Sequence, residues 1–344
     1  MPDHGADRTN GSSAAPASGG GVDVAAVRAW IRANAQPLTT TDPDAPLTDL
    51  EPLTALVGEA TVVGLGRPAH GSHELSTLTH RIFRFLVEEL GFRSLAVEES
   101  WTTGRAIDDH LLTGTGDLEA LLAGAQPQYR TEEMRSVLSW MRARNERHPA
   151  DPLRFVGLDV SGADAPGDMG VVERYMAQYL AWWHDRTGHK VAHWGGFTHT
   201  SVAEARRVSF PPAPPKTHRN AGSRLRERFG PAYASIALMF HQGTVRLGAD
   251  AVAVAPTSPG FTERFLATAG PDTYALSLHA HRPGPVQDWL AAPATLRLIG
   301  PGYDPARDAG GSMSGGSLAD WFDGIVHTRR STPTRLLRPA DAAP

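Results

Sequence analysis

Two histidines and a glutamate stand within five residues in the segment HGSHE, which runs from His70 to Glu74. An imidazole exchanges protons near neutral pH, and histidines with a carboxylate can also bind a metal ion. In the zinc motif H-E-x-x-H the glutamate lies between histidines at i and i+4, whereas His70 and His73 stand at i and i+3 with Glu74 outside them. The spacing therefore favours acid/base chemistry, and we predict no metal site.

His70 follows a short apolar run, TVVGLG at residues 61–66, which is typical of a buried parallel strand. Apolar residues then recur with helical spacing, so a helix is expected to begin near Ser72, whose hydroxyl can cap it. His73 and Glu74 belong to the first turn of this helix, where a carboxylate suits the positive end of the helix dipole. His70 lies before the helix, at the strand end where ligands of parallel sheets gather.

Two further carboxylates end predicted strands. Glu98 lies in SLAVEES, residues 94–100, and Asp159 lies near the end of RFVGLDV, residues 154–160. If the strand before His70 and the strand with Glu98 are neighbours, as a β-α-β unit predicts, the two strand ends lie about 5 Å apart. His70 and Glu98 could then form an acid/base pair or a plain structural hydrogen bond, and Asp159 could join them or cap the following loop.

The remaining sequence alternates strands with helices through most of the chain. Helices are expected in VDVAAVRAWIRANAQPL, TEEMRSVLSWMRARNER and DMGVVERYMAQYLAWWHDR, and a fourth strand in KVAHW. The alternation predicts an α/β fold with a central, mostly parallel sheet flanked by helices. Residues 1–22 are expected to form a disordered tail and residues 23–335 a single catalytic domain. The Pro-rich segment 205–223 is expected to be a long loop, either a lid or a mobile surface insertion.

The composition narrows the classes of ligand. The chain has 344 residues, 41% of them hydrophobic, and a formal net charge of -4, which favours a globular protein with no basic excess for binding nucleic acid. The chain has no cysteine, which excludes disulfides and thiol nucleophiles, and nothing in the sequence predicts a cofactor. No apolar run is long enough to span a membrane, and the first residues lack the pattern of a secretory signal, so we expect a cytoplasmic protein. The abundance of Arg, Ala, Gly and Pro is typical of a high-GC bacterium.

Several ordered motifs resemble the erythromycin esterase family. They are GRPAHGSHE, the helix RIFRFLVEELGF with the Glu98 strand after it, LSWMRARN, FVGLD and RLIGPGY. The resemblance covers residues 45–330. The resemblance implies an α/β core with additional helical segments around a deep cleft. It also implies that a histidine matching His70 activates water to open a macrolactone ester.

The chain departs from the family at positions that bear on the chemistry. The family motif G-E-x-x-H has a glutamate where this chain has Arg67, so a fixed cation replaces a carboxylate. The family motif W-A-H-N-x-H appears as WGGFTH, which keeps its second histidine as His199 and has Gly196 in place of the first. His193 precedes this motif, and strand alternation could point it elsewhere. A late D-L-R segment of the family is replaced by SLHAHR, which contains His279.

We expect an erythromycin-esterase-like enzyme that hydrolyses an ester or macrolactone of a secondary metabolite. In this reaction His70 is the general base, Glu98 orients it, and Arg67 and His199 hold the carbonyl oxygen. Further substrate contacts are predicted at His73, Glu74, Asp159, His193 and His279.

Two other functions are also consistent with the sequence, because the loss of an acid/base group usually lowers a rate by about 100- to 10,000-fold. The cleft could serve a non-hydrolytic tailoring enzyme, such as a cyclase, dehydratase, lyase or isomerase. His70 would then remove a proton from a polyketide- or peptide-like substrate, and Glu98 or His199 would assist the leaving group. The chain could also bind a small molecule without changing it.

Overall fold

Two β-sheets organise the computed structural model, which describes residues 22–159, 168–268, 270–300 and 302–337. The strands of the larger sheet are β1 (Gln36–Pro37), β2 (Val62–Arg67), β3 (Phe92–Ser100), β4 (Arg154–Asp159), β5 (Lys190–Gly196), β8 (Tyr233–Leu247), β9 (Asp250–Val254), β10 (Thr273–Ser277) and β13 (Gly324–Ser331). Those of the smaller sheet are β6 (Arg206–Ser209), β7 (Lys216–His218), β11 (Leu296–Arg297) and β12 (Ser312–Ser314).

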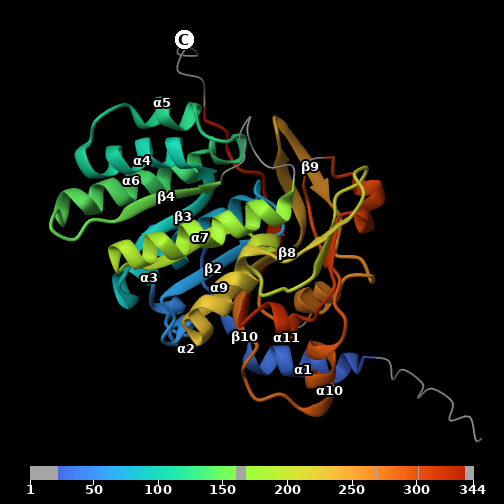
Figure 1. The fold of residues 1–344 in the computed structure, drawn as a ribbon. Helices are drawn as coiled ribbons and strands as arrows, with labels where there is room; N and C mark the ends of the chain where they lie inside the picture. Colours follow the sequence, from blue (N-terminus) through green and yellow to red (C-terminus); the bar gives the residue numbers. More distant parts are fainter. Residues whose placement is uncertain (1–21, 160–167, 269, 301, 338–344) are drawn as a thin grey trace, which may run out of the picture.

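The larger sheet is mostly parallel (Figure 1). Its strand order is β1-β10-β13-β8-β2-β5-β3-β4, and β9 pairs with β8. Every pair from β13 to β4 is parallel, whereas β1–β10, β10–β13 and β8–β9 are antiparallel. The predicted α/β fold with a mostly parallel central sheet is confirmed.

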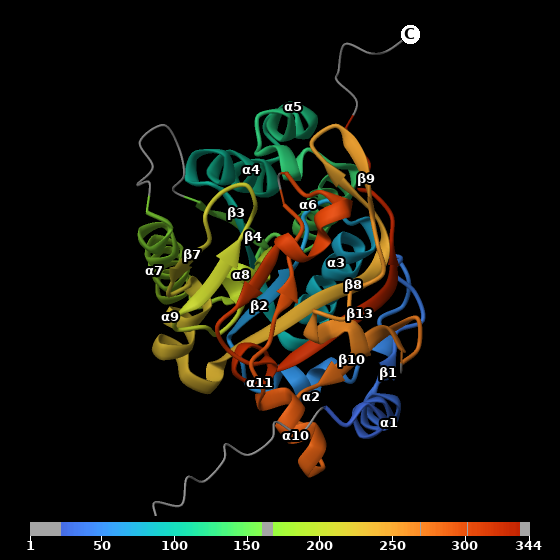
Figure 2. The ribbon, with the colours of Figure 1, turned by 90° about the vertical axis from the view of Figure 1, so that its right-hand side faces the viewer.

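Helices cover both faces of the larger sheet. The α-helices are α1 (Val24–Asn34), α2 (Leu53–Val57), α3 (His73–Leu90), α4 (Trp101–Thr113), α5 (Leu118–Ala123), α6 (Glu132–Arg147), α7 (Met169–Thr187), α8 (Phe197–Thr200), α9 (Ala221–Phe229), α10 (Gly284–Ala291) and α11 (Leu318–Trp321). Short 3-10 helices are η1 (Thr48–Leu50), η2 (Pro127–Tyr129), η3 (Gly230–Ala232), η4 (Thr262–Thr268) and η5 (Pro305–Gly310). In Figure 2, α7 and α9 lie on one side of the sheet and α3 on the other.

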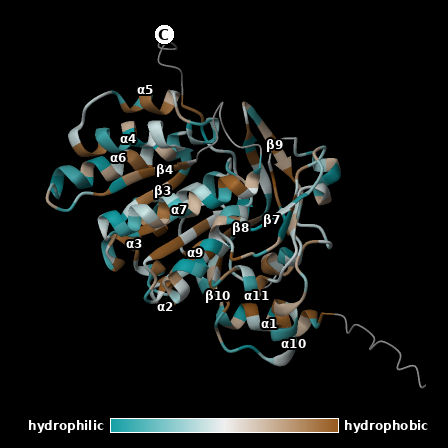
Figure 3. Cartoon of the chain, in the orientation of Figure 1, coloured by the Kyte–Doolittle hydropathy of each residue, from teal (hydrophilic) through white to brown (hydrophobic). Residues whose placement is uncertain are grey.

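Strand alternation assigns each side chain of β2 to one of these two layers. Val63 and Leu65 belong to the apolar cluster that includes α3, whereas Val62 packs in the cluster formed with α7 and α9. Both faces of the sheet are therefore buried, as a continuous apolar run predicts. Figure 3 shows the same pattern, with hydrophobic colour along the central strands and hydrophilic colour on outer parts of the helices.

Helix α3 begins and ends where the sequence predicts. The Ser72 hydroxyl accepts a hydrogen bond from the backbone N–H of Leu75 at 3.3 Å and so caps the first turn. Gly91 follows the last turn with a φ of 75°, the left-handed conformation in which helices commonly end. His70 is thus left outside the helix, between β2 and the cap.

The Pro-rich segment 205–223 is not one long loop, so this part of the prediction is wrong. Its residues form β6 and β7, which pair as an antiparallel hairpin, and the first residues of α9. The prolines lie mainly in the connection 210–215, where a missing backbone N–H interrupts no ladder. The hairpin is held from within by Arg206, whose side chain is buried.

The predicted tail, residues 1–22, lies outside the described residues except for Val22, and the boundaries of the predicted single domain stay a prediction. No helix within the described residues is long and apolar enough to cross a membrane.

Gly66 on β2 supports a close contact between the sheet and α8. A Cβ at this position would overlap Thr200 Oγ1 and the backbone of Phe197. We expect Gly66→Ala to lower the free energy of unfolding by about 1–3 kcal/mol, as overpacking of a core does. Denaturant titration measures this loss. Gly284→Ala is the control, because nothing lies within 4 Å of a Cβ there. Equal losses of stability in both variants would contradict the close contact between Gly66 and α8.

Candidate active site

Glu98 reaches His70 across an intervening strand. The strands β2 and β3 do not pair, because β5 lies between them, so the predicted neighbour relation is wrong. Glu98 Oε2 nevertheless lies 3.6 Å from His70 Nε2. The end of β5 consists of Gly195 and Gly196, and a Cβ on Gly195 would overlap Glu98 Oε1. The absence of a side chain on Gly195 lets the carboxylate cross the strand.

The carboxylate of Glu98 lies between two imidazoles. Its Oε1 accepts a hydrogen bond from the backbone N–H of Gly196 at 2.7 Å and lies 3.8 Å from His199 Nε2. Its Oε2 faces His70. The backbone N–H of Glu98 donates to the Tyr129 hydroxyl at 3.1 Å, which fixes the strand end. The structure therefore brings together the three residues for which we predicted a catalytic role.

Arg67 contacts His70 from the side opposite to Glu98. Its Nη1 donates to Ser76 Oγ at 2.9 Å, its Nη2 lies 3.3 Å from His70 Nδ1, and its guanidinium lies over the Trp194 ring at 5.2 Å. A guanidinium only donates hydrogen bonds. His70 Nδ1 is therefore the acceptor in this contact, and the ring proton lies on Nε2, toward Glu98.

The surroundings separate the proton affinities of the two imidazoles. Burial, opposed by Glu98 and reinforced by the cations of Arg67 and His199, lowers the pKa of His70 to about 4. Burial also disfavours the imidazolium of His199, but the carboxylates of Glu173 and Glu98 outweigh it and raise its pKa to about 9. Burial disfavours the charged form of Glu98 as well, yet the two histidines hold its pKa below the ordinary value. At neutral pH the site holds neutral His70, anionic Glu98 and protonated His199.

Glu173 on α7 is the group that our sequence analysis missed. It is fully buried and accepts hydrogen bonds from His199 Nδ1 at 2.9 Å and from the backbone N–H of Ala221 at 2.8 Å. It also pairs with buried Arg206 of β6, and these neighbours hold its pKa well below the ordinary range although burial opposes them. A signal was present in the sequence, because Glu173 shares a helical stripe with buried Ala177 and Leu180.

His193 lies inside this cluster and not away from it. Its side chain is fully buried, and neither ring nitrogen has a hydrogen-bond partner among the described residues. His193 and Gly195 share one face of β5, so the ring lies near the Glu98 carboxylate. Burial lowers the pKa of His193 to about 4. The expectation that strand alternation points it elsewhere is therefore wrong, and its burial leaves no surface for a substrate in this structure.

His73 and Glu74 contact residues other than His70. His73 Nδ1 lies 2.6 Å from Glu133 Oε1 on α6, and the carboxylate of Glu74 accepts hydrogen bonds from Thr332. Both residues belong to the first turn of α3, as expected. That these two residues bind the substrate stays a prediction. It is not favoured by the structure, because both side chains already pair with other protein groups.

His279 lies near another edge of the sheet. It follows β10, which runs antiparallel to β13, so it lies beside the amino end of that strand and pairs with Asp323 at 2.9 Å. The carboxyl ends of the parallel strands, which carry His70 and Glu98, point the other way. The structure therefore does not support a direct role of His279 beside His70. The sequence could not show this, because it did not reveal the direction of β10. Asp159 ends β4 next to Ser100 of β3, and its side chain lies outside the described part of the structure.

A cavity of about 490 Å³ opens beside His70, and we call it the His70 pocket. The side chain of His70 is 36% exposed, more than those of Glu98 and His199, which are 10% and 18% exposed. The pocket is lined by His70, Gly71, Pro127, Gln128, Thr131, Arg246, Leu247, Gly248, Ile299, Gly300, Gly302, Thr334 and Leu336. His70 is therefore the cluster member best placed to touch a ligand.

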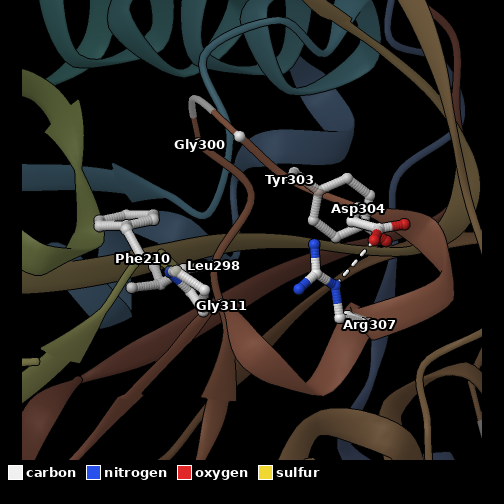
Figure 4. A pocket seen from close by; sticks show the side chains of 9 residues that line it. Phe210, Leu298, Gly300, Tyr303, Asp304, Arg307 and Gly311 are labelled. Carbon is white, nitrogen blue, oxygen red and sulfur yellow. Dashed lines mark hydrogen bonds and ion pairs between the residues drawn. The ribbon is translucent and has the colours of Figure 1, made fainter. Parts of the chain in front are cut away.

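A smaller cavity of about 20 Å³ adjoins the His70 pocket and shares Gly300 and Gly302 with it. Figure 4 shows Phe210 on one side of this cavity and Tyr303 and Arg307 on the other. Phe210 belongs to the connection between β6 and β7. The Pro-rich segment thus approaches the pocket, and its role as a lid stays a prediction.

The sequence profile of the erythromycin esterase family matches residues 87–172 and 161–331 of the chain. The chain belongs to the erythromycin esterase family. The matched segments include Glu98, Glu173 and His199, whereas His70 and Arg67 lie before them. The predicted family is confirmed.

Two curated relatives match shorter parts of the chain. Erythromycin esterase type II from Escherichia coli is 28% identical over 131 residues, which are 38% of this chain and 31% of that protein. A putative hydrolase, YbfO, from Bacillus subtilis (strain 168) is 28% identical over 133 residues, which are 38% of this chain and 28% of that protein. The matches thus span less than a third of the length of these relatives.

Three solved structures share the fold of this chain over most of its length. A Bacillus cereus protein aligns with a TM-score of 0.77 at 20% identity and covers 92% of this chain and all of that protein. A protein described as a succinoglycan biosynthesis protein aligns over 92% of this chain and all of that protein, with a TM-score of 0.76 and 21% identity. An erythromycin esterase mutant, EreC, in its open conformation aligns with a TM-score of 0.65 at 16% identity over 89% of this chain and 99% of that protein.

We expect Glu173 to keep His199 protonated. Replacing Glu173 by Gln removes the carboxylate that contributes most to the raised pKa of His199, so that pKa should fall from about 9. NMR titration of the His199 imidazole measures the change. Glu204→Gln is the matched control, because Glu204 is exposed and pairs with Arg219 instead. An unchanged His199 pKa in a folded Glu173→Gln protein would contradict the assignment.

Proposed function

We propose that this member of the erythromycin esterase family is a hydrolase that cleaves an ester or lactone bond, with His70 as the general base. The observation that carries the proposal is the position of neutral His70, which lies on the wall of the pocket with Nε2 toward the Glu98 carboxylate. A carboxylate that faces one ring nitrogen raises the basicity of the other nitrogen and stabilises the imidazolium formed during reaction. The base atom is then Nδ1.

In the proposed reaction Arg67 Nη2 turns from His70 Nδ1 to the substrate carbonyl oxygen, which frees the lone pair of Nδ1, and a water molecule then approaches this nitrogen. His70 takes a proton from the water, whose oxygen bonds to the carbonyl carbon, and the imidazolium then returns the proton to the departing alkoxide as the carbon–oxygen bond breaks. Arg67 lies beside Nδ1 and donates from its Nη2 to the developing oxyanion. Glu98 stabilises charged His70, and protonated His199 keeps Glu98 ionised.

The lining of the pocket supports a small-molecule substrate with an apolar portion. Pro127, Leu247, Ile299 and Leu336 contribute apolar surface next to His70. Apolar walls with a few convergent polar groups are typical of small-molecule sites. We therefore propose an ester or macrolactone of a polyketide- or peptide-like secondary metabolite as the substrate class. The name of the Escherichia coli relative is consistent with this class.

A second reaction class is favoured by Arg67 itself. A buried cation beside the base could bind a substrate carboxylate or stabilise an enolate, which forms when His70 removes a proton from carbon. The same residues would then perform a cyclisation, elimination or isomerisation. In this version no water enters the product.

Oxygen-18 water separates the two reaction classes. We expect that a panel of chromogenic acyl esters and macrolactones, incubated with the protein in oxygen-18 water, gives a carboxylic acid that carries one labelled oxygen, as mass spectrometry detects. His70→Ala should lower the rate by about 100- to 10,000-fold. His148→Ala is the control, because His148 is exposed at the end of α6. An unlabelled product of unchanged mass would reject hydrolysis, and full turnover by His70→Ala would reject both reaction classes.

The pH dependence tests the contact between Arg67 and His70. A general base must be unprotonated, so kcat/KM should fall as the pH drops through the His70 pKa of about 4. Arg67 lowers that pKa, so Arg67→Gln should move the acid limb of the profile to higher pH. Arg105→Gln is the control, because Arg105 is exposed on α4 and pairs with Asp109. An acid limb that does not move in Arg67→Gln would contradict the electrostatic role of Arg67.

A further inference from the structure

An extended segment after β13, residues 332–337, closes one side of the His70 pocket, and we call it the strap. It lies against the first turn of α3, where the backbone N–H of His73 donates to the carbonyl of Thr332 at 2.8 Å. The backbone N–H of Thr334 donates to the carbonyl of Gly71 at 3.0 Å. The strap is thus joined to the residue that follows His70.

Glu74 holds the first residue of the strap. Its carboxylate accepts hydrogen bonds from the backbone N–H of Thr332 at 2.6 Å and from the Thr332 hydroxyl at 2.7 Å. Hydrogen bonds to an ionised acceptor are roughly twice as strong as neutral ones. Glu74 therefore anchors the strap at the first turn of α3.

The other end of the strap is held by the start of α6. The backbone N–H of Glu132 donates to the carbonyl of Arg335 at 2.8 Å, and the backbone N–H of Arg335 donates to the Glu133 carboxylate at 3.2 Å. The backbone N–H of Leu337 donates to the carbonyl of Arg130 at 3.1 Å. Two helix starts that are far apart in sequence therefore fix one short segment.

Side chains alternate along the strap. Thr334 and Leu336 line the His70 pocket, whereas Arg335 lines a separate cavity on the other side. The side chain of Leu336 is large and apolar, and the residue is 39% exposed. It shares the pocket with the apolar residues Leu247 and Ile299. When a ligand covers a partly exposed leucine in an apolar wall, the burial of apolar surface makes binding more favourable.

We propose that the strap is the specificity-determining wall of the His70 pocket and that Leu336 selects substrates with an apolar chain or ring face next to the scissile bond. Glu74 is a positioning residue, because it acts by holding the strap. This inference rests on the proposed hydrolase function for its kinetic test. It assigns to the second half of HGSHE a role in shaping the pocket in place of a direct contact with substrate.

A series of chromogenic esters from acetate to octanoate tests the role of Leu336. We expect Leu336→Ala to raise KM for the octanoyl ester about five- to tenfold, as loss of part of a leucine contact predicts, with little change for the acetyl ester. Leu112→Ala is the control, because Leu112 is similarly exposed on α4. Equal effects on short and long esters, or the same effect from Leu112→Ala, would overturn the proposal.

Variants of Glu74 test the positioning role. Glu74→Ala should raise KM for the octanoyl ester without lowering kcat for the acetyl ester, and it should accelerate hydrogen exchange at the amides of Thr332 and Thr334. Glu74→Gln keeps an acceptor oxygen and should restore part of the loss. A fall of kcat for every ester at unchanged KM would instead indicate a general structural role and would overturn the positioning role.

Binding of an amide analogue distinguishes failure of this inference from failure of the proposed function. Calorimetric titration of octanoyl anilide should show binding to the wild-type protein and weaker binding to Leu336→Ala. If no ester is hydrolysed but this difference is found, the hydrolase proposal fails and the strap proposal stands. If esters are hydrolysed but Leu336→Ala binds the anilide as tightly as the wild type, the strap proposal fails alone.

Discussion

The arrangement of the site depends on the carboxylate of Glu98. A buried carboxylate is stable only when hydrogen-bond donors and positive charge replace the water it has lost. Glu98 finds the backbone N–H of Gly196 at the end of β5 and the imidazolium of His199 on α8. It reaches them because Gly195 has no side chain that would block the way. The same position brings its second oxygen to His70.

Charge alternates along the buried groups behind the pocket. Anionic Glu98 is followed by protonated His199, anionic Glu173 and cationic Arg206, so each carboxylate lies next to a cation. These four charges balance, and buried Arg67 adds one positive charge beside His70. His70 lies at the end of this series and stays neutral because burial and the cation of Arg67 both disfavour its protonation. The proton-accepting group therefore faces the pocket, and the fixed charges lie behind it.

Arg67 sets the direction of the hydrogen bond at His70 Nδ1. The side chain is buried, donates to Ser76 and lies over Trp194, so its guanidinium is held beside His70. A glutamate at this position would accept a hydrogen bond from the Nδ1–H of His70, whereas the arginine donates to the lone pair of that nitrogen. An arginine here thus gives the hydrogen bond the opposite direction, makes His70 a weaker base and adds a donor beside it.

The sequence by itself determined the α/β class, the α3 helix with its Ser72 cap, and the place of His70 at a strand end. These features follow from local periodicity and capping, which act over a few neighbouring residues. Only the tertiary structure decided that β5 separates β2 from β3, that Glu173 joins His199, and that the strap lies on Glu74. Each of these depends on contacts between segments that are distant along the chain, which no local pattern specifies. The helical stripe of Glu173 indicates that its side chain is buried, but it does not indicate His199 as its partner.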